Sequence, residues 1–237
     1  MIGSVLFNFK GVAVELVARL FRGDIIHNLR SFNSDIPSEV FDFSWNFFFG
    51  FIRPMQVKYE FLKLLEVFRG ENPRYILEIG TANGGSLFSF CKLAADDATI
   101  ISIDLPGGDF GGGYPQWKVP VYTAFAGENQ KLVLLRKDSH KTETLNDVKK
   151  LLGDNRLDFL FIDGDHSYEG VKRDFELYSP LVREGGIIAF HDIAPEGLPE
   201  LVGGVPRFWD EIKGEFRSEE FIADVNQTGY GIGILYW

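Results

Sequence analysis

The stretch ILEIGTANGGS, residues 76–86, decides the fold, because it reads as a buried strand, a glycine turn and the start of a helix. Gly80 ends the apolar strand, and Gly84, Gly85 and Ser86 open the helix. Glycine at such a turn lets the backbone approach a ligand, and the free N–H groups of a helix start face that ligand. The turn therefore predicts a cofactor site between a strand and a helix.

Two kinds of cofactor fit this turn. A dinucleotide prefers the pattern G-x-G-x-x-G, which Gly80, Ala82 and Gly85 match only in part. The second pattern is an acid inside the strand followed by G-x-x-x-G, and Glu78, Gly80 and Gly84 match it. Because an unpaired acid in a buried strand is unfavourable, we expect Glu78 to pair with a ligand or a local N–H group.

From residue 71 onward, short apolar strands alternate with helices. The predicted strands are 74–80, 99–105, 131–138, 157–163 and 186–192, and the predicted helices are 84–95, 142–152 and 168–182. This alternation is typical of a parallel sheet covered on both faces. The tail 219–237 holds two β-like runs and no helix, which predicts an antiparallel edge hairpin. The sequence therefore predicts an α/β fold with a doubly wound, mostly parallel, seven-stranded Rossmann-like sheet.

The first 70 residues predict a helical, aromatic-rich N-terminal extension, and residues 71–237 predict the main domain. The run FDFSWNFFFGFI (41–52) has seven aromatic residues in twelve positions. It is interpreted as a core or subunit-interface cluster, with a wall of an apolar substrate pocket as the alternative. If this run forms a subunit interface, the protein is expected to be a homo-oligomer. Residues 53–70 predict a helix closed by Gly70.

Composition excludes several classes of function. The net charge of −10 argues against a nucleic-acid partner, because phosphate backbones bind basic faces. The single cysteine, Cys91, forms no internal disulfide, which favours a reducing, cytoplasmic location. The apolar stretch 5–21 contains Lys10, Glu15 and Arg19, so it is neither a transmembrane helix nor the core of a signal peptide.

Several motifs together resemble the class I S-adenosylmethionine-dependent methyltransferases. They are Glu78-Ile-Gly80-Thr-Ala-Asn-Gly84-Gly-Ser86, Asp104, Asp138-Ser139 and FIDGDHSYEG (161–170). The branch they resemble contains cephalosporin-hydroxylase-like and macrolide-sugar O-methyltransferases, and the resemblance covers about residues 71–237.

This resemblance implies S-adenosylmethionine as the cofactor. Gly80, Ala82, Asn83 and Ser86 would contact its methionine end, Asp104 its ribose, and Asp138 and Ser139 would lie near its adenine. By its position after the second strand, Asp104 also suits the ribose hydroxyls of either cofactor. The full predicted cofactor set is Glu78, Gly80, Thr81, Ala82, Asn83, Gly84, Ser86, Asp104, Asp138, Ser139 and Asp163.

Polar residues follow two further strands. Asp163 ends one strand, and His191 and Asp192 end the next. The carboxyl ends of neighbouring strands line one crevice, so these three side chains are predicted to converge as ligands of a divalent cation. Such a cation, Mg²⁺ or Mn²⁺, would grip two oxygens of a diol and lower the pKa of a hydroxyl, as in cation-dependent O-methyltransferases. A histidine ligand favours Mn²⁺, Fe²⁺ or Zn²⁺ over Mg²⁺.

The histidines have a competing interpretation as a general base. A neutral imidazole of His166 or His191 suits removal of a proton from a hydroxyl, and Asp165 is placed to orient His166. Loop solvation and helix capping by Ser167 are the structural alternative. The predicted catalytic residues are therefore His166, His191 and Asp163.

The glycine-rich loop LPGGDFGGGYPQWKVPVYTAF (105–125) predicts a lid over cofactor and substrate, since a loop of this length in a compact domain is usually functional. The predicted function is methyl transfer to a hydroxyl of a small molecule, with a sugar or glycosylated metabolite as the candidate acceptor. Two alternatives stay open: an NAD-dependent oxidoreductase, and a catalytically degenerate methyltransferase-fold protein kept for assembly.

Overall fold

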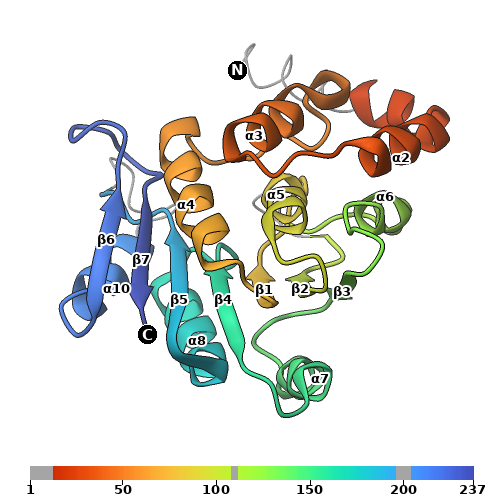
Figure 1. Ribbon diagram of the computed structural model, residues 1–237. Coiled ribbons are helices and arrows are strands. Elements are labelled where there is room, and N and C mark those ends of the chain that lie inside the picture. The colour runs from red at the N-terminus through yellow and green to blue at the C-terminus, as the bar shows by residue number, and fades with distance from the viewer. Residues whose placement is uncertain (1–12, 108–111, 196–203) are drawn as a thin grey trace.

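The structure is a computed structural model that describes residues 13–107, 112–195 and 204–237. It contains one seven-stranded sheet in the order β3-β2-β1-β4-β5-β7-β6 (Figure 1). The strands are β1 (Tyr75–Ile79), β2 (Thr99–Asp104), β3 (Lys131–Arg136), β4 (Leu157–Ile162), β5 (Val182–His191), β6 (Arg217–Phe221) and β7 (Ile232–Tyr236). β1 to β5 pair in parallel, and β7 runs antiparallel to both β5 and β6. The predicted mostly parallel sheet with an antiparallel edge is confirmed.

Helices cover both faces of this sheet. They are α2 (Arg22–Ser31), α3 (Pro37–Asn46), α4 (Lys58–Glu71), α5 (Gly85–Leu93), α6 (Val119–Thr123), α7 (Thr142–Leu152), α8 (Tyr168–Tyr178) and α10 (Gly204–Ile212), with 3-10 turns η1 (Phe47–Gly50), η2 (Gln116–Lys118) and η3 (Ser179–Leu181). Successive strand residues point to opposite faces, so Ile76 enters the core under α4 and α5, and Leu77 enters the core with α7, α8 and α10 (Figure 1).

Several predicted element boundaries differ from the structure, and one helix was not predicted. The helix predicted to reach residue 182 ends at Tyr178, and β5 already begins at Val182. Helix α4 begins only at Lys58, and its left-handed C-terminal residue is Asn72 rather than the predicted Gly70. Helix α10 was not predicted, although its buried side chains Val205, Phe208, Trp209 and Ile212 repeat at helical spacing.

The described part of the N-terminal segment packs onto the sheet domain. Residues 13–20 are helical, and α3 packs against α5. Phe43 stacks against both Phe32 and Phe88, and its ring centroid lies 4.0 Å and 5.3 Å from theirs. Much of the aromatic run therefore lies against the core of the sheet, whereas Phe49 is 82% exposed. Self-association through this segment stays a prediction.

A fully buried glutamate of helix α4 binds the segment between β6 and β7. Glu60 of α4 accepts hydrogen bonds from the backbone N–H groups of Ala223 and Gly231 at 3.0 and 2.9 Å. It also accepts one from Nε2 of Gln227 at 2.6 Å. The connection between β6 and β7 is therefore fastened to the N-terminal half of the protein; we call Glu60 and these three partners the Glu60 clamp.

No helix in the described ranges combines the length and the apolar character that crossing a bilayer requires.

Candidate active site

The glycine turn follows β1, the strand at which the strand order reverses. β2 and β3 lie on one side of β1, and β4 and β5 lie on the other. Gly80 has a φ of +91°, and a Cβ on it would stand 1.9 Å from the carbonyl oxygen of Asp163. A Cβ on Gly84 would meet the ring of Tyr122 at 2.9 Å, and one on Gly85 would meet the nitrogen of Pro54 at 2.4 Å. Packing within the protein thus accounts for all three glycines. The turn presses directly on the loop that carries Asp163.

Glu78 is completely buried at the end of β1. Its Oε2 accepts a hydrogen bond from Oγ1 of Thr81 at 3.0 Å, but its Oε1 has no partner among the described residues. Burial raises the pKa of Glu78 to about 8, although the hydrogen bond from Thr81 opposes this shift. Such an orphaned oxygen beside the glycine turn is where a ligand with a positive or N–H donor group would be stabilised.

Asp104 ends β2 and gathers backbone donors. Oδ2 accepts from the N–H groups of Thr81 and Ala82 at 3.0 and 2.8 Å, and Oδ1 accepts from Leu105 and Gly113 at 2.8 and 3.0 Å. Burial raises the pKa of this carboxyl, and these hydrogen bonds oppose the shift. Asp104 therefore joins the glycine turn to Leu105 and Gly113 of the glycine-rich loop.

The described part of the predicted lid lies against the cofactor turn. Tyr114 and Tyr122 are fully buried, with ring centroids 4.8 Å apart. The hydroxyl of Tyr122 donates to the carbonyl of Ala82 at 2.8 Å. Trp117 stacks on Phe51 of the N-terminal segment. Residues 112–125 thus cover the turn; the other glycines of the loop, up to residue 111, lie partly outside the described residues.

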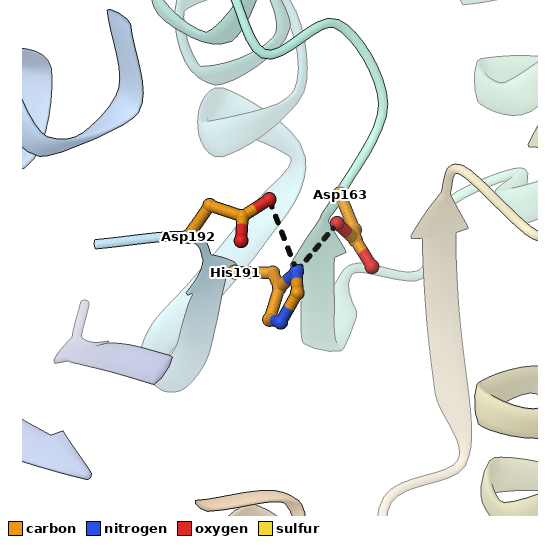
Figure 2. Close-up of side chains that lie close together, drawn as sticks. All are labelled: Asp163, His191 and Asp192. Carbon is orange, nitrogen blue, oxygen red and sulfur yellow. Dashed lines mark hydrogen bonds and ion pairs between the residues drawn. The ribbon is translucent and has the colours of Figure 1, made fainter. Parts of the chain in front are cut away.

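Three polar side chains meet at the ends of β4 and β5 (Figure 2). Nδ1 of His191 lies 3.0 Å from Oδ1 of Asp163 and 3.3 Å from Oδ2 of Asp192. One ligand atom from each residue lies within 4.8 Å of the others. Asp192 has a φ of +63°, a left-handed backbone that turns its carboxylate toward its neighbour His191. The structure brings together the three residues predicted from the sequence to bind a cation.

His166 joins this cluster from the loop after β4. Its Nδ1 lies 2.8 Å from Oδ2 of Asp192, and its Nε2 lies 3.9 Å from Oδ1 of Asp163. Asp165 instead accepts a hydrogen bond from the backbone N–H of Ser167, and the Ser167 hydroxyl caps α8 by accepting from the N–H of Gly170. The loop thus divides its polar side chains between the site and the helix cap.

Gln56 is a site residue that the sequence reasoning missed. Its Nε2 donates to Oδ2 of Asp163 at 2.7 Å, and the side chain is buried. A carboxylate only accepts hydrogen bonds, so the amide nitrogen must face it and Oε1 is left without a partner among the described residues. A lone glutamine just before α4 carries no motif. Only its position in space identifies it.

The carboxylates raise the pKa of both histidines. Although burial opposes it, the charges of Asp163 and Asp192 raise the pKa of His191 well above its usual value. The pKa of His166 is also raised, because its hydrogen bond to Asp192 and the charge of Asp163 outweigh burial. In turn, His191 and His166 hold the pKa of Asp192 well below its usual value against the effect of burial. A cation binding between the carboxylates would replace the proton on Nδ1 of His191.

Asp138 and Ser139, predicted to lie near the adenine, come just after the end of β3, which is an edge strand of the sheet. Oδ1 of Asp138 accepts from the backbone N–H of His140 at 2.9 Å, and the carbonyl of Ser139 accepts from the hydroxyl of Tyr178 at 2.7 Å. These bonds hold the loop against α8. Nε2 of His140 also lies 3.3 Å from Oδ1 of the fully buried Asp174.

We expect the pair of His140 and Asp174 to stabilise the fold most at low pH. The neighbouring carboxylate of Asp174 raises the pKa of His140 above its ordinary value of 6.5. This stabilisation is therefore complete below pH 6.5 and is lost as the pH rises through the raised pKa. The free energy of unfolding in urea should differ more between wild type and His140→Gln at about pH 5.5 than at about pH 8.5. A difference independent of pH would contradict this assignment.

A family model and two curated proteins match this chain. Residues 77–193 match the model of a family described as "Methyltransferase domain". The uncharacterized protein y4gI of Sinorhizobium fredii is 34% identical over 172 residues, which is 70% of this chain and 17% of that protein. This chain spans less than two thirds of each of its two curated relatives, 17% of the first and 62% of the second.

Two solved structures have the same fold. The O-methyltransferase TomG of Streptomyces achromogenes, in complex with S-adenosylmethionine, superposes with a TM-score of 0.54 at 18% identity, covering 86% of this chain and 91% of that one. An O-methyltransferase of Bacillus cereus, in complex with S-adenosylhomocysteine, superposes with a TM-score of 0.54 at 17% identity, covering 87% and 93%. At this identity the likeness concerns the fold.

Proposed function

We propose that this protein uses S-adenosylmethionine to methylate a hydroxyl of a small molecule, because residues 77–193 match the model of a methyltransferase domain. One observation carries the proposal: in a sheet of this fold, the cluster of Asp163, His166, His191 and Asp192 lies directly against the glycine turn. A cofactor bound at this turn would lie beside groups that can remove a proton. A sugar or glycosylated metabolite is the candidate acceptor.

The residues around the turn fit S-adenosylmethionine, whose sulfonium supplies an electrophilic methyl group when the cofactor is bound. Glu78 offers a buried Oε1, without a partner in the part of the chain that the structure describes, that suits an ammonium group. Helix α5 begins at Gly85, and among the described residues no side chain caps it at Gly84, so its first N–H groups suit a carboxylate. Asp104 would take the ribose hydroxyls by exchanging some of its backbone donors.

The cluster also fits a divalent cation. Adjacent ligand atoms of an octahedral site with bonds of about 2.1 Å lie about 3.0 Å apart. The separations of Nδ1 of His191 from the oxygens of Asp163 and Asp192, 3.0 and 3.3 Å, agree with that spacing. One imidazole and two carboxylates suit Mn²⁺, Fe²⁺ or Zn²⁺ as well as or better than Mg²⁺. These three residues would hold the ion, whose charge favours the alkoxide form of a hydroxyl.

His166 is the better placed of the two histidines for a general base. Asp192 holds its Nδ1, so Nε2 is the ring nitrogen left to take a proton. Its side chain is 35% exposed, whereas that of His191 is 5% exposed and its Nδ1 faces two carboxylates. We therefore assign proton removal to His166 and cation binding to His191.

Calorimetric titration of the chelator-treated protein tests the function. S-adenosylmethionine should bind, and Asp104→Ala should weaken its binding about tenfold or more, because charge-assisted hydrogen bonds to the ribose are lost. Asp97→Ala is the matched control, since that exposed carboxylate only pairs with Arg74. Binding of NAD⁺ in place of S-adenosylmethionine would support an oxidoreductase instead. Equal binding by wild type and Asp104→Ala would remove Asp104 from the site.

A further inference from the structure

The turn before β7 has an unusual backbone. Gly229, Tyr230 and Gly231 have φ values of +76°, +59° and +81° in succession. Glycine adopts this left-handed region freely, but a tyrosine does so only against steric strain. Strain of this kind persists where the surrounding structure enforces it and is concentrated at functional sites.

Hydrogen bonds on both sides hold this turn in place. The carbonyls of Tyr230 and Gly231 accept from the N–H groups of Ala194 and Ile193, at 2.9 and 3.3 Å. The N–H of Gly229 donates to the carbonyl of Pro195 at 3.1 Å. From the opposite side, the Glu60 clamp binds the N–H of Gly231. The turn is thereby fixed against the segment that directly follows His191 and Asp192.

The Tyr230 side chain is turned toward the candidate active site. Its ring centroid lies 6.1 Å from that of His191, with the ring planes inclined by 60°. The residue is nevertheless 47% exposed. A half-exposed aromatic ring, carried by a strained and hydrogen-bonded turn, therefore stands at the site. Burial in the core does not account for it.

We propose that Tyr230 is an acceptor-binding residue, whose ring face packs against a ring-shaped acceptor while that acceptor's hydroxyl group lies at Asp163 and His166. The acceptor class is a six-membered ring with adjacent hydroxyls on one edge and a flat apolar face, as in a sugar or a catechol. This inference rests on the proposed methyl transfer and adds the shape of the acceptor. A rigid aromatic surface gives contact area without loss of side-chain entropy.

The strain gives the proposal a distinctive test. Tyr230→Gly removes the ring and also relieves the left-handed backbone, so it should not lower the midpoint temperature of unfolding while it weakens acceptor binding. Tyr230→Phe keeps the ring face and should bind the acceptor nearly as well as wild type. Tyr59→Ala is the control, because Tyr59 is a comparably exposed tyrosine, at 52%, on α4.

The experiment is calorimetry of protein loaded with S-adenosylhomocysteine and Mn²⁺. The probes are catechol and methyl α-D-mannopyranoside, which carry adjacent hydroxyls on an aryl and a sugar ring. At least one should bind wild type, about tenfold more weakly to Tyr230→Gly and with little change in Tyr230→Phe and Tyr59→Ala. Which probe binds distinguishes the two ring types.

The outcomes separate this inference from the function it rests on. Failure of wild type to bind S-adenosylhomocysteine would contradict the proposed methyl transfer. If wild type binds S-adenosylhomocysteine, the inference alone is overturned when neither ring probe binds or when Tyr230→Gly binds them unchanged. A fall in the unfolding temperature of Tyr230→Gly would show that the ring supports the fold, and would equally overturn it.

Discussion

Replacing Asp163 by asparagine is expected to reduce methyl transfer by about 10²–10⁴-fold and to weaken Mn²⁺ binding by about 100-fold. Asp163 accepts from Nε2 of Gln56 through one oxygen and contacts Nδ1 of His191 through the other. An asparagine keeps the shape but offers one acceptor, so its amide N–H₂ must face one of the two neighbours. The loss of charge also removes a cation ligand.

Asp165→Asn provides the matched control for this experiment. Asp165 lies two residues further along the same loop, and its carboxylate only accepts from the backbone N–H of Ser167. Electron paramagnetic resonance of Mn²⁺ and single-turnover rates should therefore change little in Asp165→Asn. Equal Mn²⁺ affinity in wild type and Asp163→Asn would reject the cation site, and rates within about threefold would reject any catalytic role.

Gly80→Ala is expected to destabilise the fold by about 3 kcal/mol or more. The added Cβ would meet the carbonyl oxygen of Asp163 at 1.9 Å, and the φ of +91° is unfavourable for any L side chain. Relief requires the turn and the β4 loop to separate. That movement would strain the hydrogen bonds from Gly80 N–H to Ile103 and from Asp163 N–H to Ile79. Urea unfolding measures the loss.

Gly153→Ala separates backbone strain from collision. Gly153 also has a positive φ, +58°, but a Cβ there would meet nothing within 4 Å. Its ψ of −123° lies outside the left-handed region, so the alanine variant should lose about 1–3 kcal/mol from backbone strain alone. If both alanine variants lost the same free energy of unfolding, the close approach of Gly80 to Asp163 would have no energetic weight.

The sheet was predictable because its signals are local. Apolar runs such as 99–105 and 157–163 indicate buried strands directly. The glycines of 76–86 indicate where a strand ends and the next helix begins. The meeting of Asp163 with His191 and Asp192 followed from one rule, that parallel strands end at a common edge. Topology alone carried that part of the candidate site.

Other features depend on contacts that no local pattern encodes. Gln56 reaches Asp163 across 107 residues of sequence, and it comes from the segment for which no motif was found. The left-handed backbone of Tyr230 is enforced by neighbours at 193–195 and by Glu60. Asp104 was predicted as a ribose ligand, but its four backbone donors depend on how two loops fold over it.

The Glu60 clamp has a consequence for the order of events during synthesis. Its three partners lie 163, 167 and 171 residues further along the chain than Glu60 itself. Long-range contacts of this kind form late, after the local elements. During synthesis, Glu60 is therefore translated before its partners, and most of the sheet is translated in between. Strand β7, whose Ile232 pairs with His191, and the turn that carries Tyr230 are therefore among the last parts of the fold to form.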